Sequence, residues 1–122
     1  LDLLFCNRDE LLAFTKESDE KVALENILDY TKQVVMTSGA DGALYFSGDN
    51  MVKVEAPKVT PIDTVGAGDC FAGAFIYANT MDNSIEKSLK FSCACASKVV
   101  TKYGSRLTGQ EINKIKEDVL GN

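Results

Sequence analysis

The sequence contains no histidine, and this absence removes several kinds of active site. A Ser-His-Asp triad, a Cys-His pair and a histidine-based metal site all need an imidazole ring. No two cysteines form a C-x-x-C pair; the cysteines are Cys6, Cys70, Cys93 and Cys95. We interpret them as reduced, mostly buried small residues of a cytoplasmic protein, because thiols persist in reducing compartments.

Long hydrophobic runs and an excess of positive charge are also missing. The sequence shows no signal peptide and no transmembrane stretch. Its formal net charge of −5 argues against nucleic acid or an anionic membrane as a partner. A small anionic ligand remains compatible with this charge, because backbone amides at a helix start bind phosphate without basic side chains.

Two common nucleotide-binding motifs do not occur either. There is no Walker A sequence, G-x-x-x-x-G-K-[ST], and no Rossmann fingerprint, G-x-G-x-x-G. A dehydrogenase of the Rossmann type needs its glycines where a strand leads into a helix, whereas Gly39 and Gly42 precede an expected hairpin. This disfavours a dehydrogenase fragment.

The length and the composition of the chain match those of one globular domain. The chain has 122 residues, of which 45% are hydrophobic and 25% are charged, so a hydrophobic core is feasible. It begins with Leu1 rather than Met, inside an expected strand. We therefore expect it to be a fragment of a longer polypeptide.

The pattern of apolar residues predicts an α/β fold. Short apolar runs predict strands at residues 1–6, 33–37, 43–47 and 51–55. Helical spacing predicts helices that start near residues 7 and 18, and three more at residues 66–79, 84–101 and 108–120. Strand, helix and strand within the first part of the chain indicate a βαβ unit with parallel strands. We expect a largely parallel sheet with helices on both sides.

The segment Asp63-Thr64-Val65-Gly66-Ala67-Gly68-Asp69, here called the glycine motif, carries the most chemical information. It lies between a polar loop and an apolar helical run, so its glycines mark a helix start with free N–H groups. The amides of Ala67, Gly68 and Asp69 can hold the charge that develops on a transferred phosphoryl group. Asp69 can accept the proton of a hydroxyl. The plain alternative is a helix start at which Asp69 only complements the helix dipole.

Two further segments follow expected parallel strands, where ligands of open α/β sheets bind. Asn7 and Glu10 fit a capping box, but they also fit a phosphate site at which Glu10 holds Mg²⁺ through water. The segment from Thr37 through Gly39 to Gly42 is either a plain turn or a backbone platform for a nucleotide.

Together these three segments, in this order and at these separations, resemble the C-terminal half of the ribokinase-like (PfkB-type) sugar and nucleoside kinases. The resemblance covers essentially the whole chain, and the D-T-x-G-A-G-D motif is highly specific to the family. It implies that residues 1–122 are the nucleotide-binding and catalytic portion of a single ribokinase-like domain. It also implies transfer of the γ-phosphate of ATP to a hydroxyl of a small sugar or nucleoside.

The resemblance also implies roles for individual residues. Asp69 corresponds to the catalytic base and Gly66, Ala67 and Gly68 to the anion hole. The residues implied in binding MgATP are Asn7, Glu10, Thr37, Gly39, Gly42, Thr64, Cys93, Ala96 and Gly104. Of these, Cys93 and Ala96 are equally explained as small residues that allow tight helix packing. In some family members the residue equivalent to Asp63 and carbonyls near Gly104 hold a monovalent cation such as K⁺.

The family's N-terminal half, which carries the sugar- or nucleoside-binding residues and the lid strands, is missing from this sequence. We therefore expect that missing half to be a partner of these residues and expect the chain alone to be inactive. Pairing of two copies stays open, because lid contacts often mediate it in such enzymes. The alternative function is a non-catalytic nucleotide-binding or regulatory module; another is a kinase specific for adenosine or a similar nucleoside.

Overall fold

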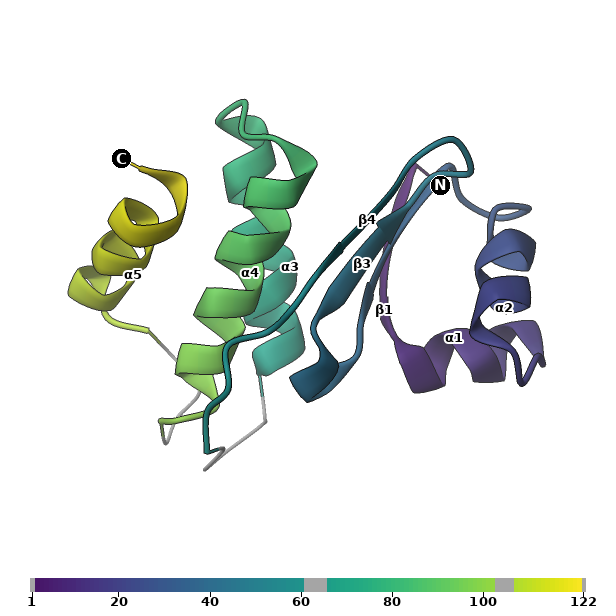
Figure 1. The fold of residues 1–122 in the computed structure, drawn as a ribbon, viewed down its shortest axis with the longest axis horizontal. Helices are drawn as coiled ribbons and strands as arrows, with labels where there is room; N and C mark the ends of the chain where they lie inside the picture. Colours follow the sequence, from purple (N-terminus) through teal and green to yellow (C-terminus); the bar gives the residue numbers. More distant parts are fainter. Residues whose placement is uncertain (1, 61–65, 103–106, 122) are drawn as a thin grey trace.

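The computed structural model describes residues 2–60, 66–102 and 107–121. A four-stranded sheet lies between two layers of helices (Figure 1). The helices α1 (Arg8–Thr15) and α2 (Glu20–Ile27) cover one face of the sheet. The helices α3 (Ala67–Thr80) and α4 (Ile85–Val99) cover the other face. Beyond them lies α5 (Gly109–Ile115), which continues as η2 (Lys116–Leu120), a turn of π-helix.

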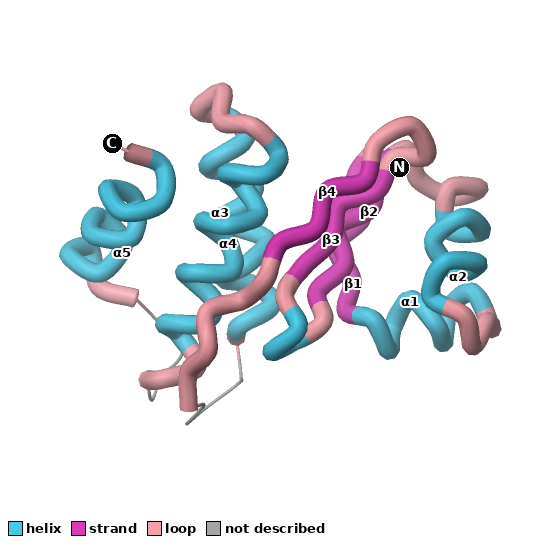
Figure 2. The backbone as a smooth tube through the Cα atoms, viewed as in Figure 1, coloured by secondary structure: helices cyan, strands magenta, loops and turns pink. Residues whose placement is uncertain are grey.

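The strands follow one another across the sheet in chain order (Figure 2). They are β1 (Leu3–Asn7), β2 (Gln33–Thr37), β3 (Ala43–Phe46) and β4 (Met51–Val54). The crossover through α1 and α2 makes β1 and β2 parallel, as expected for a βαβ unit. The pairings of β2 with β3 and of β3 with β4 are antiparallel.

The α/β architecture is as predicted, but the sheet is mixed rather than largely parallel over the described residues. The reason is the length of the connections. A short 3₁₀ turn, Gly39–Asp41, joins β2 to β3, and a short turn joins β3 to β4. Chain segments this short allow only an antiparallel return, since a parallel crossover needs a dozen or more residues.

Capping side chains define where most helices begin. Capping boxes start α1 at Asn7 and α5 at Thr108, as their sequences predict. Asp19 caps α2 and Ser84 caps α4. The exception is α3, whose N-cap is Gly66 with φ of 84° and which has no side-chain cap. That left-handed conformation is open to glycine at little cost.

The sheet buries apolar side chains on both faces. On one face, Val35 and Tyr45 pack against Phe71 and Phe75 of α3 and against α4. On the other face, β2 packs against α1 and α2. None of the described helices is both long and apolar enough to span a membrane.

Candidate active site

The carboxyl ends of β1 and β2 bring two of the three predicted segments together. Asn7 and Thr37, the last residues of these parallel strands, are register partners. A cavity of about 320 Å³, here called the polar cavity, opens at this edge. It is lined by Asn7, Arg8, Asp9, Thr37, Ser38, Gly39 and Asp41. The edge of the sheet thus carries a polar recess of the size that small-molecule sites occupy.

Asn7 and Glu10 form the capping box of α1. The Asn7 Oδ1 accepts from the Glu10 N–H at 2.8 Å, and the Glu10 Oε1 accepts from the Asn7 N–H at 2.9 Å. Each side chain therefore uses one polar atom for the helix. The Asn7 Nδ2 and the Glu10 Oε2 make no hydrogen bond within the described part of the chain, so both can also meet a ligand. Asn7 lines the polar cavity, but Glu10 is not among its lining residues.

The turn between β2 and β3 uses its two glycines differently. Gly42 has φ of 102°, and a Cβ there would overlap the Val54 carbonyl oxygen of β4. Its identity therefore follows from packing inside the sheet. Gly39, with φ of 55°, is exposed, and a Cβ on it would meet nothing within 4 Å among the described residues. Gly39 is the one of the two whose backbone a ligand can approach.

The glycine motif opens α3, and its residues 66–69 lie at the molecular surface. The first helical bond is donated by the Cys70 N–H to the Gly66 carbonyl at 3.0 Å. Within the described ranges, nothing accepts from the amides of residues 67–69. A Cβ on Gly68 would meet nothing within 4 Å among the described residues, and both Gly68 and Asp69 are exposed. These amides are therefore placed to receive an anion.

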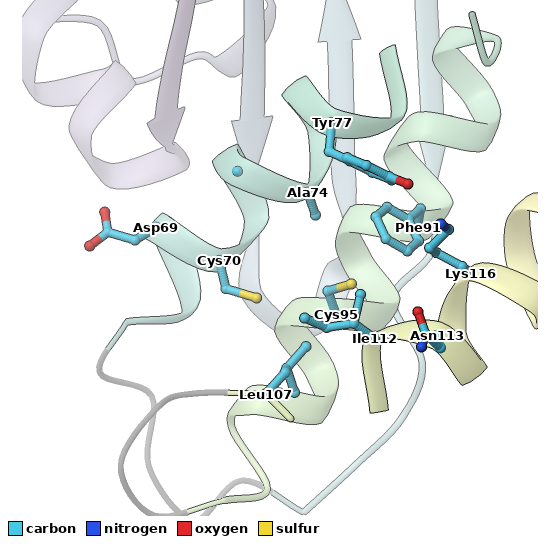
Figure 3. Close-up of a pocket in the computed structure, with 11 residues that line it drawn as sticks. Asp69, Cys70, Ala74, Tyr77, Phe91, Cys95, Leu107, Ile112, Asn113 and Lys116 are labelled. Carbon is cyan, nitrogen blue, oxygen red and sulfur yellow. The ribbon is translucent and has the colours of Figure 1, made fainter. Parts of the chain in front are cut away.

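All three segments lie at one end of the sheet. Figures 1 and 2 show the start of α3 at the end of the sheet where β1 and β2 terminate. The Asp69 carboxylate points outward on that side, away from the interior of the helical layer (Figure 3). Exposed amides and a carboxylate at one helix start can together serve the transfer of a phosphoryl group to a hydroxyl.

Two other predicted residues, Cys93 and Ala96, are not brought to this edge. Cys93 is only 4% exposed and packs in the core between α4 and the sheet; Ala96 packs against the same cluster. Burial raises the pKa of the Cys93 thiol to about 11. This environment favours the packing interpretation of the pair. Asp63, Thr64 and Gly104 lie outside the described residues.

Sequence reasoning did not single out Arg8, Asp9, Ser38 and Asp41 as site residues, although all four line the polar cavity. The sequence could have indicated them, because they lie within two residues of Asn7 or Gly39 in the chain. The Arg8 Nε donates to the Glu20 Oε1 at 3.0 Å, which ties α1 to α2 beside the cavity. No group of three or more acidic or thiol side chains suited to a metal ion occurs in ranges 2–60, 66–102 and 107–121.

Comparison with known proteins gives consistent matches. Residues 1–112 match the family described as pfkB family carbohydrate kinase. A ribokinase of Lactococcus lactis subsp. lactis is 31% identical over 102 residues, which are 83% of this chain and 34% of the relative.

Two solved structures show the same fold. Adenosine kinase from Sinorhizobium meliloti has a TM-score of 0.91 at 28% identity, over 97% of this chain and 36% of that chain. The ribokinase of Arabidopsis thaliana, solved with ribose and ATP, has a TM-score of 0.85 at 28% identity, over 94% of this chain and 40% of that chain. The chain thus spans about a third of the length of the curated relatives it matches.

Proposed function

Because the chain belongs to the pfkB family of carbohydrate kinases, we propose that it is the nucleotide-binding and catalytic portion of an ATP-dependent kinase. In this proposal residues 1–122 form part of a single ribokinase-like domain. The reaction moves the γ-phosphate of ATP to a hydroxyl of a small sugar or nucleoside. The observation that carries the proposal is the exposed Asp69 beside the open amides at the start of α3.

Asp69 acts as the base in this proposal. An aspartate is a weak base, but the transition state of phosphoryl transfer is loose, so the hydroxyl proton leaves late, when the oxygen has become acidic. The carboxylate then needs to lie close to the hydroxyl and orient it. The amides of Ala67, Gly68 and Asp69 stabilise the charge that develops on the transferred group. Gly66 supports them by its left-handed N-cap conformation.

The polar cavity at the ends of β1 and β2 holds the nucleotide. Its lining is polar and includes the exposed backbone of Gly39, so the donor groups present fit a phosphate chain or a ribose. ATP supplies the phosphoryl group, and Mg²⁺ offsets the charge of its phosphates. Asn7 would bind phosphate, and Glu10 would hold Mg²⁺ through water, since this ion usually keeps several of its waters. Thr37, Gly39 and Gly42 form the turn beneath the nucleotide.

Further residues belong to the proposal through the family resemblance. The resemblance assigns Thr64 and Gly104 to nucleotide binding and Asp63 to a site for a monovalent cation such as K⁺. In this proposal Cys93 and Ala96 support the site by packing α4 against the core.

We propose a sugar as the acceptor ahead of a nucleoside. Sequence similarity to the ribokinase from Lactococcus lactis subsp. lactis supports a sugar as the first candidate. The structural similarity to adenosine kinase from Sinorhizobium meliloti keeps a nucleoside as the second candidate. A thermal-shift screen of the intact protein with ribose, fructose and adenosine distinguishes the two, since a bound acceptor raises the melting temperature.

The decisive experiment replaces Asp69→Asn in the intact protein. We expect the rate of phosphoryl transfer to fall on the order of 10²- to 10⁴-fold, as for loss of a general base. The affinity for MgATP, measured by calorimetry, should stay within a few-fold, because Asn keeps the shape of the side chain. Asp118→Asn, which removes an exposed carboxylate from η2, is the matched control and should leave both quantities unchanged.

The alternative function is a nucleotide-binding module without catalysis. It predicts MgATP binding with no turnover that depends on Asp69. An Asp69→Asn protein as active as the parent would contradict the proposed mechanism.

A further inference from the structure

A second cavity lies between α3, α4 and α5, on the side of the helical layer that faces away from the sheet. Its volume is about 450 Å³, and we call it the apolar cavity. Residues from all three helices line it, among them Cys70, Ala74, Tyr77, Phe91, Cys95 and Ile112 (Figure 3). No role in the proposed phosphoryl transfer falls on these residues.

The walls of this cavity are apolar. Phe91 and Cys95 are almost fully buried and belong to the cluster that joins α4 to η2. The rings of Tyr77 and Phe91 lie 6.1 Å apart. Burial raises the pKa of the Cys95 thiol to about 12, so this thiol is neutral near pH 7. A ring or short hydrocarbon chain would therefore find a suitable environment here.

Among the described residues that line the cavity, the positively charged one is Lys116. Its Nζ lies 5.2 Å from the centre of the Tyr77 ring, which holds the ammonium at the mouth of the cavity. Neither an ion pair of Lys116 nor a hydrogen bond of the Tyr77 hydroxyl occurs within the described residues. Asn113 adds an amide on the same rim. Asp69 also contributes to the lining, but its carboxylate points away (Figure 3).

The backbone at Lys116 is unusual. There α5 widens into the π-helical turn η2, with the Gly121 N–H donating to the Lys116 carbonyl at 3.1 Å. Such turns are rare and occur often at functional sites.

We propose that the apolar cavity binds a small molecule with an apolar ring or chain and a single anionic group, such as an aromatic carboxylate. The apolar part lies against Phe91 and Cys95, and the anionic group meets the Lys116 ammonium and the Tyr77 hydroxyl. The site shares no lining residue with the polar cavity proposed for the nucleotide. The apolar cavity is lined on one side by Cys70, Gly73 and Ala74 of α3, so an occupant would lie against the helix that carries Asp69.

A pair of fluorescent probes tests the proposal on the intact protein without ATP. The probe 8-anilino-1-naphthalenesulfonate carries an anionic group, and N-phenyl-1-naphthylamine has the same rings without it. We expect both to bind with a fluorescence increase and the anionic probe to bind more tightly. Because ATP is absent, the result does not depend on whether the protein is a kinase.

Variants then locate the site. Lys116→Met should weaken the anionic probe about tenfold, as for loss of a contact with a charged group, and leave the neutral probe unchanged. Lys114→Met, which removes a charge from an exposed residue of the same helix outside the cavity lining, is the matched control and should affect neither. Ala74→Leu fills the cavity and should weaken both probes.

Several results would overturn the proposal. Equal effects of Lys116→Met and Lys114→Met would mean a general effect of charge. Equal losses of the two probes in Lys116→Met would remove the role of the ammonium. Unchanged binding in a folded Ala74→Leu protein would place the probes elsewhere. If that variant fails to fold, the two lysine variants still decide the question.

Discussion

Single residues at the candidate site have a structural role and, in our proposal, a chemical role as well. Asn7 and Glu10 illustrate this, since the sequence allowed either a capping box or a ligand site and the structure contains the capping box. The two interpretations are compatible, because the cap uses one polar atom of each side chain. Variants of either residue therefore change helix stability and any ligand affinity together. This is why Asp69, whose carboxylate points away from the helical layer, is the cleaner target.

Glu111 is a residue whose charge state links stability to pH. It accepts from the Thr108 N–H at 2.9 Å and from Lys102, and it lies 3.9 Å from the Lys98 Nζ. The hydrogen bond from Lys102, followed by that from Thr108, lowers the pKa of its carboxyl from 4.5 to about 2. The unfolded chain therefore binds more protons than the folded chain between these two pH values, so stability rises with pH there.

We expect Glu111 to contribute stability that is complete above pH 4.5 and lost as the pH falls toward 2. Urea unfolding of the protein at several pH values in this window measures the slope. Glu111→Gln should reduce the slope. Glu117→Gln, which changes an exposed residue of η2, should keep it. Equal slopes for the parent and the Glu111→Gln protein would show that this carboxyl does not control acid stability.

At the scale of secondary-structure elements, two glycines have opposite effects on stability. Gly42 lies at the start of β3, where β4 passes so closely that a side chain cannot fit. Gly73 lies inside α3, where a Cβ would meet nothing within 4 Å among the described residues. The first glycine allows two strands to approach each other. The second only weakens its helix, because glycine in a helix interior loses more backbone entropy than alanine.

Replacing each glycine by alanine should therefore change stability in opposite directions. Gly42→Ala should lower the free energy of unfolding by about 1–3 kcal/mol or more, because it combines an unfavourable φ with overlap against β4. Gly73→Ala should raise it by about 0.5–1 kcal/mol. Urea unfolding of the two variants beside the parent measures both. A stabilising Gly42→Ala substitution would mean that β4 does not lie against this turn.

At the scale of the whole molecule, the described residues correspond to part of the length of the family's proteins. Residues 1–112 match the carbohydrate kinase family, yet the chain spans only about a third of its curated relatives. Within the described ranges β1 pairs only with β2, and its apolar residues are half-buried. An exposed apolar edge of this kind favours pairing with further strands.

We expect the purified 122-residue chain to show no phosphoryl transfer to ribose, fructose or adenosine. In our proposal the site supplies groups for the phosphates and a base, and none of these residues is assigned to the acceptor hydroxyl. A coupled assay of ATP consumption measures this, with the Asp69→Asn chain as the control for contaminating activity. Turnover that is present in the parent chain and absent in the control would show that these residues suffice.

The sequence alone determined the local features of this protein. Side-chain periodicity and capping residues depend on neighbours in the chain, so the positions of the strands, both capping boxes and the start of α3 were predictable, and the order of the motifs identified the family. The tertiary structure decided the rest, because it depends on contacts between distant segments. It placed Asn7 beside Thr37, buried Cys93 in the core and left a cavity between α3, α4 and α5.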